Sequence, residues 1–140
     1  MTKEWVQVDR NDVSLDDFMT GLIAGLAKLG VDVVSIRENL FYKAVIDAFE
    51  VFKTEAQIAG VSPRFRLRLN RVYGDSPDIR DALTRAVQRD LVSLDNPEYL
   101  DVRLKISRGD ADLYLERLAG NADMYLDAAR EFRAAYPSYV

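Results

Sequence analysis

The sequence contains no cysteine and no histidine, and these two absences exclude much of common enzyme chemistry. Without a thiol or an imidazole, the chain has no disulfide framework, no Cys/His zinc site and no Ser-His-Asp triad. An enzyme would have to rely on carboxylates, tyrosines, lysines or serines alone. We therefore predict that the protein is not an enzyme and has no catalytic residues.

Motifs for cofactors and metals are also missing. The glycines form neither a GxGxxG pattern nor a P-loop, and no EF-hand loop occurs. The acidic clusters at 9–17 and at Asp110/Asp112 offer a hard cation only weak ligands, and helix capping explains them better. We expect no cofactor and no metal site.

Long hydrophobic runs are absent as well. The longest uncharged stretch, residues 18–27, is about half of what a membrane-spanning helix requires. The first ten residues lack the apolar region of a secretory signal. These features predict a cytoplasmic protein with no membrane partner.

The composition is that of a globular protein. The chain has 140 residues, of which 49% are hydrophobic and 30% charged, with a net charge of −4. This length is enough to bury a core without disulfides. We predict a single domain over residues 1–140.

Two helices are predicted in the first half. The first begins after the N-cap Ser14 and stops at Gly30, and its Gly21 and Gly25, one turn apart, allow a neighbouring helix to approach closely. The second begins at a capping box over residues 35–38 and ends at Gly60.

Residues 64–73 fit two patterns. With period two, Phe65, Leu67 and Leu69 face inward and the arginines at 64, 66 and 68 face water, as on an edge strand. With period 3.6, Phe65, Leu69, Val72 and Tyr73 form a helical face. We favour a strand for the first half of the segment.

The second half predicts a helix, a hairpin and a helical C-terminal region. Ser76 is the N-cap and Pro77 the first residue of the helix. Residues 92–94 and 100–106 alternate on either side of a turn at 95–98, which predicts a hairpin. The C-terminal helical region spans about 110–135, with a break at 120–121.

An eleven-residue interval recurs in that region, and eleven residues are about three helical turns. Residues at this interval would therefore share one face of a continuous helix. The face suits packing on a partner helix in the same chain or in a second one, and we favour the same chain. The candidate interface residues are Tyr114, Leu118, Tyr125, Ala129 and Tyr136.

A second candidate surface lies within residues 76–118. The segments 76–79 (Ser-Pro-Asp-Ile), 82–83, 90–92 and 105–109 resemble the second half of a winged helix-turn-helix of the MarR/PadR type of transcription regulators. In those families a helix with a Ser-Pro start reads the major groove, a hairpin wing touches the DNA, and terminal helices form a dimer.

The resemblance implies that Arg80, Thr84, Arg85 and Arg89 contact DNA. The alternative, which we favour, is that these arginines pair with Asp78, Asp81 or Glu98 on a solvated face. The acidic turn at 95–98 also departs from the basic wing that phosphate contacts require.

The predicted fold is mainly α (α+β), with four to five helices and a small two- or three-stranded β element. A winged-helix-like arrangement is one alternative for it, and residues 5–8 are a candidate edge strand. The expected function is that of a non-catalytic adaptor, inhibitor or accessory subunit that binds another protein, or itself as a homo-oligomer, through a helical surface. The alternative function is a dimeric winged-helix DNA-binding regulator. The predicted core is Leu15, Phe18, Leu22, Leu26, Phe41, Val45, Phe49, Phe52, Leu83, Val87, Leu104, Ile106, Leu118 and Phe132.

Overall fold

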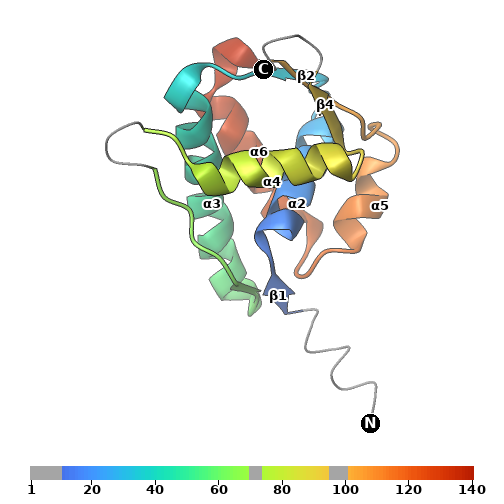
Figure 1. The fold of residues 1–140 in the computed structure, drawn as a ribbon. Coiled ribbons are helices and arrows are strands. Elements are labelled where there is room, and N and C mark those ends of the chain that lie inside the picture. Colours follow the sequence, from blue (N-terminus) through green and yellow to red (C-terminus); the bar gives the residue numbers. More distant parts are fainter. Residues whose placement is uncertain (1–10, 70–73, 95–100) are drawn as a thin grey trace.

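The computed structural model describes residues 11–69, 74–94 and 101–140 (Figure 1). The edge strand expected at residues 5–8 and the acidic turn at 95–98 lie outside the described residues. Within them the fold is mainly α with a small antiparallel sheet, as the sequence predicts.

Three helices form the centre of the molecule, and two more pack around them. Helices α2 (Leu15–Lys28) and α3 (Glu38–Ala59) both pack against α6 (Ala122–Ala135). Helix α4 (Pro77–Gln88) crosses over α2, and the short α5 (Ala111–Glu116) lies along the other side of α2 (Figure 1).

The main sheet has three antiparallel strands in the order β2-β5-β4. Strands β4 (Val92–Leu94) and β5 (Asp101–Leu104) form the predicted hairpin, and β2 (Val33–Ser35) joins the other edge of β5. The sheet thus ties the hairpin after α4 to the connection between α2 and α3.

A second sheet, of two short strands, lies at the end of the molecule opposite the three-stranded sheet. Strand β1 (Asp12–Val13) pairs in parallel with β3 (Ser62–Pro63). This pairing joins the start of α2 to the segment that follows α3.

Several predicted helix boundaries are confirmed. The hydroxyl of Ser14 accepts a hydrogen bond from the N–H of Asp17 at 3.1 Å, and that of Ser76 accepts one from the N–H of Ile79 at 3.3 Å. Gly60 ends α3 in the left-handed conformation, with φ at 75°. These residues satisfy backbone groups that helix ends leave open.

The predicted capping box at the start of α3 is wrong. Ser35 lies in β2, and its hydroxyl donates a hydrogen bond to the carboxylate of Asp101 at 2.8 Å. The helix begins at Glu38, and its N-cap, Arg37, makes no side-chain capping hydrogen bond. Strand pairing with β5 therefore takes the hydroxyl that the capping box would need.

The close helix approach predicted for Gly21 and Gly25 is confirmed. A Cβ atom at Gly21 would lie 2.1 Å from Cδ1 of Tyr125, and one at Gly25 would lie 2.9 Å from Cβ of Ala129. Neither glycine tolerates a side chain without movement of α6. The two glycines therefore set the distance between α2 and α6.

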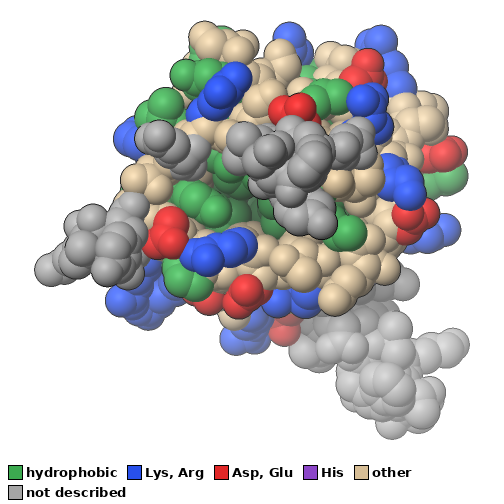
Figure 2. All heavy atoms as spheres, turned by 45° about the horizontal axis from the view of Figure 1, so that its top comes forward, with side chains coloured by type: hydrophobic (Ala, Val, Ile, Leu, Met, Phe, Trp, Pro, Cys, Tyr) green, Lys and Arg blue, Asp and Glu red, His purple; other side chains and the backbone are tan. Residues whose placement is uncertain are grey.

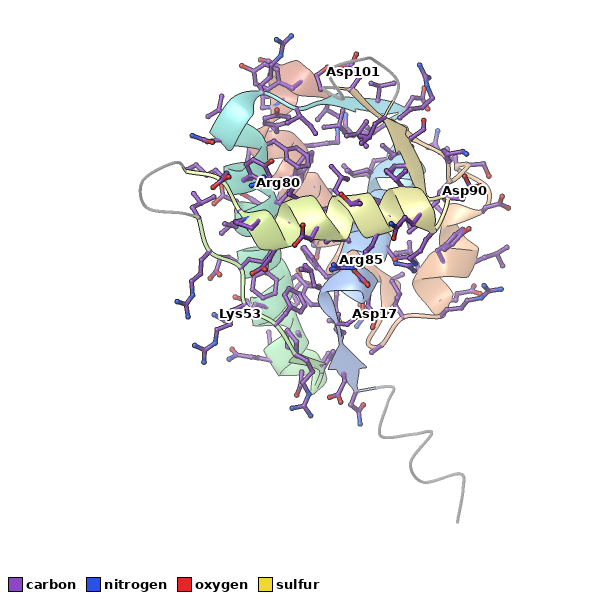
Figure 3. All side chains as sticks on the ribbon, viewed as in Figure 1. Asp17, Lys53, Arg80, Arg85, Asp90 and Asp101 are labelled. Carbon is purple, nitrogen blue, oxygen red and sulfur yellow. The ribbon has the colours of Figure 1, made fainter. Side chains whose placement is uncertain are left out.

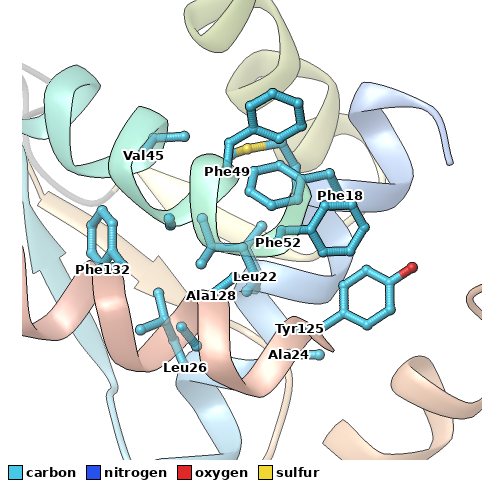
Figure 4. Packing of buried hydrophobic residues seen from close by; sticks show 14 of the residues in the cluster. Phe18, Leu22, Ala24, Leu26, Val45, Phe49, Phe52, Tyr125, Ala128 and Phe132 are labelled. Carbon is cyan, nitrogen blue, oxygen red and sulfur yellow. The ribbon is translucent and has the colours of Figure 1, made fainter. Parts of the chain in front are cut away.

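The core holds two groups of packed aromatic rings, one around Phe18 and one around Phe132, with aliphatic side chains between them (Figure 4). Phe18 packs on Phe49 and Phe52 with ring centroids 5.5 Å and 5.2 Å away, and Phe52 contacts Tyr125 at 5.0 Å. The predicted core residues are buried, apart from four that are only partly buried. Those four are Leu15, Val87, Leu104 and Leu118.

Candidate interaction surfaces

The arginines predicted to contact DNA lie on α4, and two of them are engaged within the chain. Nη2 of Arg80 lies 2.6 Å from Oδ2 of Asp75, and Nε of Arg85 lies 2.7 Å from Oδ1 of Asp16. Figure 3 shows Arg80 at one end of α4 and Arg85 nearer its other end. The ion pairs that we favoured are present, but with acidic partners other than the predicted ones.

The other two predicted residues differ from these. The hydroxyl of Thr84 donates a hydrogen bond to the carbonyl of Arg80 at 3.1 Å, so it is engaged with its own helix. Arg89 is exposed at the C-cap of α4. Of the four predicted contacts, Arg89 is the side chain that is exposed and makes no ion pair within the described residues.

Acidic side chains are interleaved with the basic ones around α4. Asp78 and Asp81 are exposed on the helix, and Asp90, just beyond its end, forms an ion pair with Lys105. On the face drawn in Figure 2, Lys and Arg side chains alternate with Asp and Glu. This region does not present the uniform positive potential on which DNA affinity depends.

The predicted C-terminal interface stripe divides between core and surface. Tyr125, Ala129 and Tyr136 are 0–2% exposed, whereas Tyr114 and Leu118 are partly buried. The helix breaks at Gly120, where φ is 86°, and restarts with Asn121 as N-cap. The interface prediction is therefore corrected for the three buried residues: they pack inside this chain, as we favoured, and offer no surface to a partner.

Both buried tyrosines also use their hydroxyls within the chain. The hydroxyl of Tyr125 donates to the carbonyl of Ala119 at 2.7 Å. That of Tyr136 accepts from the N–H of Arg37 at 2.6 Å and donates to the carbonyl of Ser35 at 2.7 Å. Burial raises the pKa of both tyrosines, so each hydroxyl keeps its proton and its structural role.

A groove of about 540 Å³ runs between α3 and the segment that follows β3. We call it the arginine groove. It is lined on one side by residues of α3 and on the other by Pro63 and residues 65–68. The α3 residues are Phe49, Glu50, Lys53 and Gln57.

The local sequence explains why the arginines line this groove. Phe65 packs on Phe49 and Phe18, with ring centroids 4.8 Å and 5.9 Å away. In an extended chain alternate side chains point to opposite faces, so anchoring Phe65 inward turns Arg64 and Arg66 outward. Burial alternates in this way through Leu69, while only Ser62–Pro63 belong to a strand. The strand predicted for the first half of residues 64–73 is thus wrong as an assignment, although the predicted inward and outward faces are right.

The groove carries more positive than negative charge. Nε of Arg64 lies 3.0 Å from Oδ1 of Asp12. Lys53, Arg66 and Arg68 form no ion pair within the described parts of the chain, and Glu50 is the one acid in the groove lining. Sequence reasoning placed the arginines in water but gave them no function; their alternation was the available signal.

A second depression, of about 600 Å³, lies between β2 and the C-terminal end of the described chain. It is lined by residues 29–33 and by Arg133, Ala134, Pro137 and Val140. Arg133 donates a long hydrogen bond, 3.5 Å, to the carbonyl of Leu29 across it. Its single cation makes it a weaker candidate for an ionic partner than the arginine groove.

One carboxyl group has an unusual pKa. Burial, together with a hydrogen bond to the side chain of Asp127, raises the pKa of Glu55 to about 7. Glu55 lies on α3 and Asp127 on α6, and the negative charge of Asp127 adds to the rise in the pKa of Glu55. A carboxyl of this pKa suits acid–base catalysis, but Glu55 lines neither groove.

Within residues 11–69, 74–94 and 101–140, no three acidic side chains gather in a way that would hold a metal ion. No helix of these ranges is both long and apolar enough to cross a bilayer. Comparison with protein-family models, curated proteins and solved structures found no match for this chain.

Proposed function

We propose that the protein is a non-catalytic binding protein, an adaptor, inhibitor or accessory subunit, that binds another protein through the outer face of α3 and the arginine groove. One observation carries the proposal: Lys53, Arg66 and Arg68 surround the groove without ion pairs among the described residues. Arginine is also enriched at protein interfaces.

Whether an arginine already has an ionic partner affects the free energy of binding a new anion. Arg80 and Arg85 would have to give up their partners Asp75 and Asp16 before they could bind a new anion. Arg66 and Arg68 would keep all their present contacts while binding one. Charges of this kind favour rapid and selective encounter with a partner of opposite charge.

One large apolar side chain near the end of α3 is exposed. Ile58 on α3 is 84% exposed and follows Gln57, which lines the groove. A single exposed isoleucine is ordinary on a protein surface. Ile58 is not among the residues that line the groove, so the proposal does not depend on it.

The groove favours a partner other than a second copy of this chain. In a two-fold dimer the same patch meets itself. Two arginine grooves face to face would place like charges opposite one another, which is unfavourable. A homo-oligomer would therefore have to form through another surface.

Site-specific cross-linking in the cells of origin tests the proposal. A photo-cross-linking amino acid at Gln57 is expected to trap a distinct protein, and Lys53→Glu is expected to reduce the yield. The same amino acid at Glu116, on the exposed side of α5, is the control position. Equal products from both positions, or none from Gln57, would reject this surface.

A DNA-binding regulator is the second candidate, and the order of elements favours it. Helix α4 starts at Ser76-Pro77 and leads directly into the antiparallel hairpin β4–β5, as the winged-helix resemblance requires. We expect salt-dependent retention on a mixed DNA pool if this candidate is right, with a smaller salt slope for Arg89→Ala. A lack of retention at low salt would eliminate it.

A further inference from the structure

We infer that the arginine groove binds an extended acidic peptide segment, which adds to residues 65–69 as a strand. This inference rests on the proposed function and specifies its partner. It depends on two independent features of the same segment, namely its unpaired backbone and the regular spacing of its positive charges.

Beyond Arg64, the backbone of this segment pairs with no described strand. Strand β3 pairs with β1, and the N–H of Arg64 still donates to the carbonyl of Val13 at 2.8 Å. The chain then enters α2 at Leu15, so β1 goes no further. From Phe65 to Leu69 no backbone hydrogen bond is formed with any described residue. Such an edge is a ready template for strand addition.

The segment is nevertheless held in place. Phe65 is anchored against Phe49 and Phe18, and Leu67 is partly buried against the core. Figure 1 shows this part of the chain running beside α3. A peptide that pairs with a held edge loses less entropy in ordering the complex than one that must first order its receptor.

The charges fit an acidic strand. Arg66 and Arg68 are two residues apart, so their side chains leave the backbone on the same face, about 7 Å from one another. Acidic side chains two residues apart on an added strand have the same spacing and lie opposite them. Lys53 on α3 supplies a third cation from the facing wall.

The same observations disfavour a nucleic acid in this groove. Single-stranded nucleic acids are held by stacking of bases on open aromatic faces. Phe49 is 4% exposed, and Phe65 packs against both Phe49 and Phe18.

Charged residues on an edge have another established use, which is to prevent aggregation by strand pairing. This use requires that the edge bind nothing. If an acidic strand binds, the arginines do more than prevent aggregation at the edge; if nothing binds, edge protection is sufficient to explain them.

The experiment uses a fluorescein-labelled peptide of about ten residues that alternates Glu and Thr. Two probes of equal charge accompany it: the same peptide with all of its backbone amides methylated, so that neither edge can donate a hydrogen bond, and an oligothymidylate. Fluorescence anisotropy measures affinity for the full chain. We expect the first peptide to bind at least about tenfold more tightly than either other probe, because only it can pair along the edge.

The variants test the charges. Arg66→Glu with Arg68→Glu is expected to weaken peptide binding by at least about tenfold. Replacing the same two arginines with lysine is expected to retain most of the affinity. Arg108→Glu with Arg117→Glu makes an equal charge change on exposed residues at or near α5, and it is expected to leave the affinity within about threefold.

Amide hydrogen exchange tests the backbone directly. Addition of the peptide is expected to slow exchange at residues 65–69, and not in α5. Binding without this protection, or equal binding of the methylated peptide, would overturn strand addition. Absence of peptide binding would also overturn it, whereas the proposed function would still stand if Gln57 traps a partner in cells. Failure of that cross-link as well would reject both.

Discussion

Two regions of the molecule arise from regular spacing in the sequence: the contact between α2 and α6, and the arginine groove. The α2–α6 contact is sealed by side chains, whereas the groove is open. At the first, Tyr125 and Ala129 fill the space above Gly21 and Gly25. At the second, Arg66 and Arg68 stand beside α3 with no described partner. Spacing shows which residues share a face, whereas the element opposite decides whether that face is core or surface.

The sealed contact should be the more sensitive of the two to added volume. In Gly21→Ala the new methyl group would overlap the ring of Tyr125, which already packs on Phe52. We expect a loss of about 3 kcal/mol in the free energy of unfolding, despite the roughly 1 kcal/mol that alanine gains in a helix. Chemical denaturation measures the loss.

Gly109→Ala is the matched control for this prediction. A Cβ atom there meets nothing within 4 Å. The expected change is within about 0.5 kcal/mol. Similar stability for the two variants would mean that α2 and α6 are not held together at the glycines.

Removal of one hydroxyl should sharpen the comparison by weakening a second buried contact, between the end of α6 and β2, with little change in volume. Tyr136→Phe leaves the N–H of Arg37 and the carbonyl of Ser35 without their partner. We expect a loss of about 1–2 kcal/mol in thermal or chemical unfolding. Tyr139→Phe, whose hydroxyl forms no hydrogen bond within the described residues, should change the stability much less.

The junction of α3 and α6 should respond to pH. The folded protein keeps the proton of Glu55 up to about pH 7, whereas the unfolded chain releases it near the usual pKa of 4.5. The folded state therefore binds more protons in this window, and stability falls as pH rises through it. Glu55→Gln mimics the protonated carboxyl and should reduce this fall.

Denaturant midpoints across that window measure the effect. The stability of Glu55→Gln relative to the natural chain should rise steadily with pH. Glu116→Gln, at an exposed glutamate on α5, should run parallel to the natural chain. Parallel curves for both variants would contradict the raised pKa of Glu55.

The open region should show the smallest effect on stability. Arg66→Glu with Arg68→Glu alters exposed side chains that make no ion pair among the described residues. We expect the free energy of unfolding to change by less than about 0.5 kcal/mol. A larger loss in chemical denaturation would indicate that these arginines stabilise the fold, and the contrast with Gly21 would disappear.

The sequence predicts local features of this fold well. The caps at Ser14 and Ser76, the stop at Gly60 and the hairpin β4–β5 depend on residues close together in the chain. Local hydrogen bonding and backbone preference are sufficient to determine them.

The predictions are wrong where a segment far away in the sequence determines which hydrogen bonds form. Ser35 would cap α3, but Asp101 binds its hydroxyl across the sheet. Residues 64–69 alternate like a strand, yet among the described residues no neighbouring strand continues far enough to pair with them.

The candidate site shows the same limit. Tyrosine is common at interfaces, which made Tyr125 and Tyr136 reasonable candidates. Only the fold reveals that Tyr125 faces Gly21 and that Tyr136 bonds to β2. The groove was predictable only as a row of exposed arginines, because its second wall comes from α3.

The position of β5 in the middle of the sheet has a consequence for synthesis on the ribosome. Ser35 of β2 is translated 66 residues before its partner Asp101. At about 5–20 residues per second, β2 waits for roughly 3–13 s without its neighbour. Helix α6, which covers α2 and α3, emerges later still. The face of Phe52 that Tyr125 covers therefore stays open in the nascent chain until α6 has been synthesised.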